Sequence, residues 1–365
     1  MSSRGNFVSE WFGHRVYPTV SESTISLSDQ QSGRCPFLSQ ATGEDKMCVK
    51  SPAAHGICSI NSASNGARQD WLICPYRALD PALVESVARR LYGAPASRAA
   101  HIVPAPTMAR SADRKRFIEA VRRGDLAVLY VQDKLGGEIS IAPTDRSPEL
   151  SFDITMVEVH GRDEHFALGR YGIFEVQTMD FHGSYRAVVQ NLKDALRLHS
   201  AAFHDTLTSN PAWLSQKIEG PNIANVFKRT FYQIVLKFQI AADGNCAGCV
   251  LALPAAVWDS WQRHLGKPDL VETPSGTFSL GPPIEQPGGT RAWIYVFDLD
   301  TQSDITPSPV IISKVIETSA EQLIHHALTV APAAAISGSG SADRVGASIL
   351  RRISQWWPEI EAPTK

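Results

Sequence analysis

Hydrophobic residues recur at helical spacing in several segments of the chain. In the first of these, Leu83, Val87 and Leu91 fall on one face. Asp80 precedes this segment as an N-cap, and Gly93 follows it as a residue that can end a helix. Further helices are expected over residues 111–123, 184–198 and 222–238, with a short C-terminal helix after a flexible joint at 336–344.

Runs rich in β-branched and aromatic residues lie between these helical segments. Strands are expected over residues 126–131, 151–159, 171–179, 250–253 and 292–299. Pro104 and Pro106 indicate a linker between the first two helices. Helices that alternate with strands predict an α/β sandwich built around a mixed central sheet.

The first 79 residues differ from the rest of the chain. They hold four of the six cysteines, many Ser, Gly and Asn residues, and little hydrophobic periodicity. Such a segment has few means of building its own core, so a bound metal is a candidate for stabilising it. We therefore predict an N-terminal metal-binding region over 1–79, a core domain over 80–335, and a linker with a C-terminal helix over 336–365.

Composition places the chain among ordinary globular proteins, with 43% hydrophobic and 20% charged residues. No run of about eighteen hydrophobic residues is present, and the first residues lack the hydrophobic stretch of a secretory signal. We expect a soluble, cytoplasmic protein without a membrane partner. Because the net charge is −2, any binding of nucleic acid must come from local clusters of Lys and Arg.

Two carboxylates and one amide are the main candidates for chemistry. Glu175 and Gln177 lie two residues apart in one predicted strand, so their side chains project from the same face. Asp153 lies in the preceding predicted strand. If the two strands are antiparallel neighbours, all three groups converge. Two carboxylates at a solvated sheet end, without chemistry, are the alternative interpretation.

Converging carboxylates suit a hard divalent cation such as Mg²⁺. With Mg²⁺ on Asp153 and Glu175, a phosphate oxygen could be bound and a water activated. Gln177 could orient that water or the phosphate, but it cannot accept a proton at a useful pKa. The base would then be metal-bound hydroxide or a substrate phosphate. Glu138 is a further candidate acid near the same edge.

The cysteines form two groups. Cys35, Cys48, Cys58 and Cys74 lack the CxxC spacing of common zinc sites, so spacing alone favours four reduced thiols. A second group, Cys246 and Cys249, is a true CxxC pair, but one pair cannot complete a structural metal site. We expect this pair to be reduced and without function.

Several basic and polar residues are candidates for holding DNA. On the predicted helix over 222–238, a polar face gathers Asn225, Lys228, Arg229 and Tyr232. Arg can pair with guanine and Lys with phosphate, although a solvated helix face is the alternative. Weaker candidates are Arg77, His182, Tyr185, Arg186 and Lys217.

The chain resembles the NotI-type restriction endonucleases in a series of blocks that occur in order. The blocks are FGHRVYP (12–18), CPFL (35–38), DWLICPYRALDP (70–81), KLGGEIS (134–140), SPELSFD (147–153), YGIFEVQTMDFHGSY (171–185), EGPNIANVFKRTFYQ (219–233), GTFSLG (276–281) and AWIYVFDLD (292–300). Together they extend over about residues 6–300 and leave a divergent tail.

This resemblance implies a PD-(D/E)XK nuclease core that acts as a homodimer on a palindrome. It implies that Asp153 and Glu175 bind the metal, and that Glu138 supplies the additional acid. Gln177 stands where most such nucleases have lysine. The implied substrate is double-stranded DNA with a GC-rich site containing CGGCCG, with GCGGCCGC as the candidate. A bacterial source and a cognate DNA methyltransferase as functional partner also follow.

The resemblance also bears on the N-terminal cysteines. NotI-type proteins carry a four-cysteine metal site, described with iron, and Cys35, Cys48, Cys58 and Cys74 fall at the matching positions. Tetrahedral thiolate coordination suits iron or zinc. The implied role is structural, holding the N-terminal region against the nuclease.

Three functions are therefore candidates for this protein. The first is a type II restriction endonuclease that uses Mg²⁺. The second is a non-catalytic, metal-stabilised protein that binds specific DNA on a nuclease scaffold. The third is an iron–thiolate redox protein, for which the sequence offers no cofactor motif. Phosphate-binding loops, HExxH and nucleophile-elbow motifs are absent from the sequence, so ATP hydrolysis, zinc proteolysis and esterase chemistry have no support.

Overall fold

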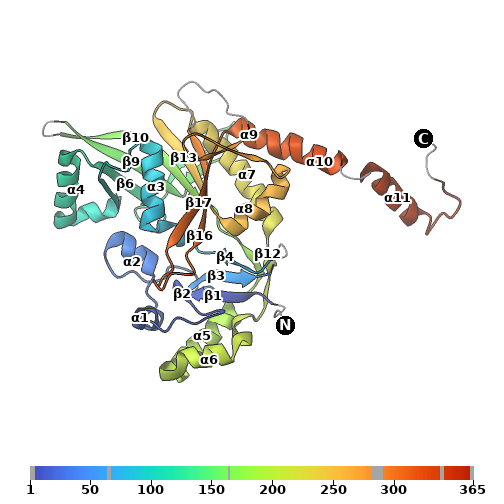
Figure 1. The fold of residues 1–365 in the computed structure, drawn as a ribbon, viewed down its shortest axis with the longest axis horizontal. Coiled ribbons are helices and arrows are strands. Elements are labelled where there is room, and N and C mark those ends of the chain that lie inside the picture. The colour runs from blue at the N-terminus through green and yellow to red at the C-terminus, as the bar shows by residue number, and fades with distance from the viewer. Residues whose placement is uncertain (1–4, 64–66, 163–164, 282–290, 338–340, 362–365) are drawn as a thin grey trace.

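The computed structural model describes residues 5–63, 67–162, 165–281, 291–337 and 341–361, and a large mixed β-sheet forms its centre (Figure 1). Its strands are β5 (Ala100–Pro104), β6 (Leu126–Gln132), β9 (Ile154–Arg162), β10 (His165–Val176), β13 (Cys246–Pro254), β14 (Leu270–Glu272), β15 (Phe278–Leu280), β16 (Ala292–Leu299) and β17 (Val310–Thr318). In the described residues the strand order is β14-β15-β17-β16-β13-β10-β9-β6-β5.

The centre of this sheet combines both strand directions. β9 and β10 are antiparallel neighbours, whereas β10 runs parallel to β13, and β13 runs parallel to β16. Parallel strands need crossover connections, and helices supply them. The predicted α/β sandwich around a mixed sheet is therefore confirmed.

One face of the sheet is covered by α3 (Pro81–Tyr92). The side chain of Asp80 accepts hydrogen bonds from the backbone N–H groups of Ala82 and Leu83, and Gly93 ends the helix in the left-handed conformation. The predicted apolar face is buried, and it packs against sheet residues such as Val128 and Phe174. The caps and the hydrophobic spacing thus predicted this helix correctly.

The opposite face is covered by α7 (Ile223–Ile240) and α8 (Ala255–Gln262). Ile234 and Phe238 of α7 are buried in one cluster with Leu251 of β13 and Ile294 of β16. The amphipathic pattern of residues 222–238 therefore places α7 directly on the strands that follow it in the chain.

The described residues contain further helices. They are α1 (Thr24–Ser32), α2 (Pro36–Thr42), α4 (Ser111–Arg123), α5 (Arg186–Leu198), α6 (Phe203–Ser209), α9 (Ala320–His325), α10 (Ala331–Ser337) and α11 (Ser341–Ile353). Single turns of 3₁₀ helix occur at Pro75–Leu79, Ala105–Ala109, Ser200–Ala202, Pro211–Leu214 and Arg263–Leu265, and a π-helical turn occurs at His326–Val330.

The N-terminal region contains a second sheet and a core, contrary to the expectation from its composition. Its strands are β1 (Phe7–Trp11), β2 (His14–Arg15), β3 (Ile57–Ser62) and β4 (Gln69–Leu72). Trp11 and Ile60 are fully buried, and they share a hydrophobic cluster with Leu192 of α5 and Phe203 of α6. The missing partners of this sheet come from residues far along the chain, which explains why its own sequence lacked a core pattern.

Two short ribbons complete the strands, namely β7 (Ile139–Ile141) with β8 (Leu150–Phe152), and β11 (Phe181–Gly183) with β12 (Ile218–Pro221).

The prediction of a linker at Pro104 and Pro106 is wrong. Pro104 ends the edge strand β5, which tolerates a residue without an N–H, and Pro106 lies in a 3₁₀ turn.

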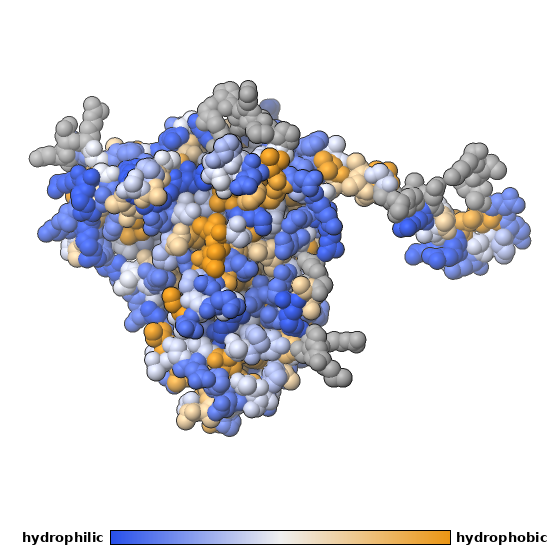
Figure 2. Space-filling model, in the orientation of Figure 1, coloured by the Kyte–Doolittle hydropathy of each residue, from blue (hydrophilic) through white to orange (hydrophobic). Residues whose placement is uncertain are grey.

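The C-terminal segment extends away from the body of the protein as α10 and α11 (Figure 1). The predicted C-terminal helix is confirmed as α11, which begins at Ser341 inside the expected joint over 336–344. Residues 338–340 of that joint lie outside the described residues. Hydrophobic residues are exposed on this arm, among them Ile336 and Ile349 (Figure 2).

No helix in the described residues is both long enough and apolar enough to cross a membrane.

The division of the chain into units at residues 79 and 335 stays a prediction. Leu79 and Leu83, on either side of the first boundary, belong to the same buried cluster.

Candidate active site

Asp153 and Glu175 meet where β9 and β10 separate. The last paired residues are Ile154 and Phe174, so the two acids lie one position beyond the ladder. The backbone N–H of Asp153 donates to Glu175 Oε1 at 3.2 Å, and the backbone N–H of Val176 donates to Asp153 Oδ2 at 2.9 Å. Each carboxylate therefore replaces a ladder hydrogen bond of the neighbouring strand. The prediction that these strands are antiparallel neighbours is confirmed.

A cavity of about 420 Å³ opens over the two carboxylates. All four candidate catalytic residues line it, namely Glu138, Asp153, Glu175 and Gln177. Its wall also includes Tyr76, Gln132, Asp133, Asp180, Arg229, Thr230 and Gln233. Because five carboxylates and one guanidinium share this wall, the cavity has an excess of negative charge that favours a cationic ligand.

Among the three candidate acids, Glu175 is the most buried, with 6% of its surface exposed. Burial, and then the Asp153 carboxylate, raise the pKa of Glu175 to about 8, while Lys237 opposes this shift. Burial also raises the pKa of Asp153, and burial together with Asp153 raises the pKa of Glu138. Asp153 therefore raises the pKa of both other acids, as a carboxylate close to them would.

Lys237 of α7 is a site residue that the sequence did not reveal. Its side chain is buried, and its Nζ contacts Glu175 Oε2. The available signal was a lysine within the hydrophobic face of the predicted helix, at helical spacing from Thr230 and Ile234. A buried ammonium on such a face needs a charged partner.

Gln177 follows the end of β10 and is held at both ends of its amide. Its Nε2 donates to the carbonyl of Thr178, and its Oε1 accepts from the hydroxyl of Thr230. Thr230 is thus a second site residue on the buried face of α7 that the sequence analysis did not identify. One hydrogen of Nε2 and one lone pair of Oε1 remain for a ligand.

The prediction that Arg77 contacts DNA is wrong. Arg77 is 2% exposed, its guanidinium pairs with the buried Glu10 at 2.9 Å, and it lies over the ring of Phe37. A guanidinium with a buried carboxylate partner and a stacked ring has an internal structural role. It is therefore not available to a phosphate.

Among the other DNA candidates, the structure brings Arg229 to the cavity. Arg229 is exposed and pairs with Asp180 at 2.9 Å on the cavity wall. Asn225 and Lys228 are exposed on α7 outside the cavity lining, next to the exposed Tyr232.

The β11–β12 ribbon brings together candidates that are far apart in the sequence. His182 and Lys217 are both exposed, and the backbone N–H of Ser184 donates to the carbonyl of Lys217 at 2.9 Å. Arg186 is exposed at the start of α5, whereas Tyr185 is half-buried, and burial raises its pKa to about 12. Tyr185 therefore fits a packing role better than the other three do.

The four N-terminal cysteines converge on one region of the core. Cys35, Cys58 and Cys74 are buried in one cluster, and Cys48 packs against it. A hydrogen bond between the thiols of Cys58 and Cys74 lowers the pKa of Cys74 to about 6. Backbone N–H groups donate to the sulfurs of Cys35, Cys48 and Cys74. Burial nevertheless raises the pKa of Cys35 to about 12, and the hydrogen bond to Cys74, together with burial, raises the pKa of Cys58.

The side chains in the described residues do not form a ready-made ligand set for a metal. No group of three or more His, Cys, Asp or Glu residues there is placed so that it could hold an ion. All six cysteines are described and free of disulfides, and Cys246 and Cys249 are buried in β13. The thiols are thus gathered but not in coordination geometry.

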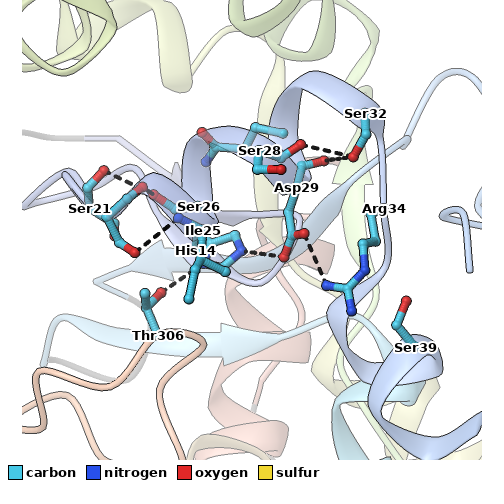
Figure 3. Close-up of polar contacts among 12 residues, drawn as sticks. His14, Ser21, Ile25, Ser26, Ser28, Asp29, Ser32, Arg34, Ser39 and Thr306 are labelled. Carbon is cyan, nitrogen blue, oxygen red and sulfur yellow. Dashed lines mark hydrogen bonds and ion pairs between the residues drawn. The ribbon is translucent and has the colours of Figure 1, made fainter. Parts of the chain in front are cut away.

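A second polar cluster ties the N-terminal region to the loop before β17 (Figure 3). His14 is fully buried, its Nδ1 lies 2.7 Å from Thr306 Oγ1, and its Nε2 lies 3.0 Å from Asp29 Oδ2. Arg34 also donates to Asp29. Burial lowers the pKa of His14, so the neutral ring links a hydroxyl donor to a carboxylate acceptor.

Comparisons with known proteins do not indicate a function, so a proposal has to be argued from the geometry of the site. No family model matches this chain, and no curated protein gives a significant match.

Proposed function

We propose that this protein is a nuclease that depends on a divalent metal. The observation that carries the proposal is the meeting of Asp153 and Glu175 at the separation of two central strands, beneath a cavity rich in carboxylates. More particularly, we propose a type II restriction endonuclease of the NotI type with a PD-(D/E)XK core. Its substrate would be double-stranded DNA with a GC-rich palindrome containing CGGCCG, for which GCGGCCGC is the candidate.

The donors around the cavity fit Mg²⁺. This ion is usually held by one or two carboxylates and keeps several waters, so Asp153 and Glu175 suffice, with Glu138 nearby. Burial is the main cause of the raised pKa values of all three acids, and a bound cation would favour their charged forms. When bound, the ion would polarise a phosphate oxygen and activate a water.

The residues of this chain would then position the reacting groups. Gln177, whose amide is fixed by Thr230, would offer its remaining hydrogen and lone pair to the attacking water or the phosphate. Arg229 could exchange Asp180 for a backbone phosphate, because both are exposed at the rim of the cavity. Asn225, Lys228, His182, Arg186 and Lys217 remain proposed DNA contacts, and Tyr185 is the weakest of the set.

Cleavage of both strands of a palindrome favours a homodimer. The two scissile phosphates of a palindrome are related by twofold symmetry. Each chain contributes one site with Asp153 and Glu175 in the described residues. A homodimer would therefore place one site on each strand. A cognate DNA methyltransferase would be the functional partner of such an enzyme in a bacterial cytoplasm.

We also propose a structural iron or zinc ion for the N-terminal cysteines. The soft sulfur donors of Cys35, Cys48, Cys58 and Cys74 suit either metal, and three of these sulfurs accept backbone N–H groups. The thiols would have to move to bind an ion, because they are not in coordination geometry here. Such an ion would stabilise the packing of α2 and β3 against the turn at Pro75–Leu79.

A non-catalytic DNA-binding protein on the same scaffold is the second candidate. The exposed basic residues beside the cavity would serve this function equally well. Retention of Asp153, Glu175 and Glu138 on one cavity favours the enzyme, since binding alone does not need acids that repel phosphate.

Incubation of the protein with a GC-rich plasmid and Mg²⁺ tests the proposal. We expect discrete fragments, no fragments in EDTA, and no cleavage by Asp153→Asn, which should keep its affinity for DNA in Ca²⁺. The matched control is Asp269→Asn, an exposed acid outside the site, which should cleave normally. Binding without cleavage would favour the second candidate, and neither binding nor cleavage would contradict both.

A further inference from the structure

Lys237 is an unusual residue for the position it occupies. Its side chain is 5% exposed, and in the described part of the chain Glu175 is the ion-pair partner found for it. It does not line the cavity, whereas Thr230, Gln233 and Ile234 on the same face of α7 do. Lys237 therefore contacts Glu175 from behind the cavity wall.

The charges around this ammonium are those of the site itself. Glu138, Asp153 and Glu175 all interact electrostatically with Lys237, and the ring of Phe152 lies 5.9 Å from its Nζ. Gln177 is uncharged. In the described residues, Lys237 is thus the buried cation that balances the carboxylates at the end of β10.

Packing alone does not explain this pair. A buried ion pair loses the hydration of both charges, and hydrophobic residues of similar volume are often as stabilising. The rest of this face of α7 is hydrophobic, including Ile234 and Phe238. A lysine at this position therefore does not stabilise the fold more than a hydrophobic residue would, which suggests that it acts on the carboxylate of Glu175.

We propose that Lys237 is a positioning residue that holds Glu175 for the divalent metal. Lys237 fixes Oε2, and the backbone N–H of Asp153 fixes Oε1, so the plane of the carboxylate is set before any cation arrives. The inference rests on the proposed nuclease function. The Lys237 ammonium should also weaken metal binding, because a positive charge next to a metal ligand repels the metal.

This arrangement gives opposite effects on binding and on catalysis. Lys237→Met removes the charge but keeps the length of the side chain. Without the ammonium, we expect Mn²⁺ to bind about tenfold more tightly, because the carboxylates lose a competing cation. With Glu175 no longer held, we expect kcat for plasmid cleavage to fall about a hundredfold at unchanged KM. A residue that only supports folding would not tighten metal binding.

The test measures Mn²⁺ binding by calorimetry and Mg²⁺-dependent cleavage for the full-length protein and its variants. Lys237→Arg, which keeps the charge, should bind Mn²⁺ like the wild type and recover part of kcat. Lys237→Gln, which keeps a donor without the charge, covers the case in which the methionine variant does not fold. Lys314→Met, an exposed lysine of β17, is the matched control and should change neither measurement.

Each outcome decides one claim. Unchanged Mn²⁺ affinity in both neutral variants overturns the role of Lys237, as does wild-type kcat in either of them. A wild-type protein that binds Mn²⁺ but cuts no DNA overturns the nuclease proposal, while the binding measurements still decide whether Lys237 is the counter-ion. Absence of Mn²⁺ binding by the wild type overturns both.

Discussion

At the scale of single residues, the two central carboxylates of the site have few hydrogen-bond and ion-pair partners. Glu175 is held by one ammonium and one backbone N–H, and Asp153 by one backbone N–H. Both carboxylates thus keep lone pairs for a ligand, and both line the cavity from which a ligand could reach them. Arg77 and Glu10 differ because neither lines the cavity, and the guanidinium lies between a buried acid and the Phe37 ring.

His14 leads to a prediction on pH and stability. Burial lowers its pKa below 6.5, opposed by Asp29 and Glu10 and assisted by Arg77. As pH falls through about 6.5, the unfolded chain binds a proton at His14 that the folded chain does not bind. The contribution of His14 to stability is thus present above pH 6.5 and is lost as pH falls toward its lower folded pKa.

Urea unfolding at about pH 7.5 and about pH 5.5 measures this effect. The wild type should lose more unfolding free energy between the two values than His14→Gln does, by up to about 1 kcal/mol. An equal loss in the two proteins would mean that His14 titrates alike in the folded and unfolded chains.

At the scale of elements, α7 and the turn at Pro75–Leu79 connect the site to the rest of the fold. The inner face of α7 supplies Thr230 and Lys237 to the end of β10, and the turn carries Tyr76 and Leu79 along the cavity wall. Cys74 precedes that turn directly. A metal at the four cysteines would therefore stabilise one wall of the cavity.

Metal analysis of the purified protein tests this link. We expect about one iron or zinc per chain, lost in Cys74→Ser and kept in Cys249→Ser, whose thiol is equally buried but lies in β13. Loss of the metal should lower Tm of Cys74→Ser by more than about 4 °C, since even about 1 kcal/mol shifts Tm by a few degrees. Metal retained in Cys74→Ser, or lost in Cys249→Ser, would contradict the four-cysteine site.

At the scale of the whole molecule, local patterns predicted the central layers and missed what long-range pairing creates. α3 and β16 were predicted within a residue or two, because caps and hydrophobic runs are local signals. The sheet β1–β4 was missed because its hydrophobic partners lie in α5 and α6.

In the candidate site, too, local sequence patterns predicted some residues and missed those that depend on tertiary contacts. The meeting of Asp153 and Glu175 followed from strand alternation and pairing. Lys237 did not, because it contacts a residue 62 positions earlier in the chain and only the packing of α7 shows it. Arg77 was misassigned because its partner Glu10 lies 67 positions away. Sequence spacing identifies charged groups, whereas tertiary contacts decide which of them reach a ligand.

Crystals of the protein soaked in Mn²⁺ test the central claim most directly. Anomalous diffraction should show one peak within about 2.5 Å of both an Asp153 oxygen and a Glu175 oxygen, inside the cavity. In Asp153→Asn crystals the peak should weaken or disappear. A cavity without Mn²⁺, or a peak that contacts neither carboxylate, would contradict the account.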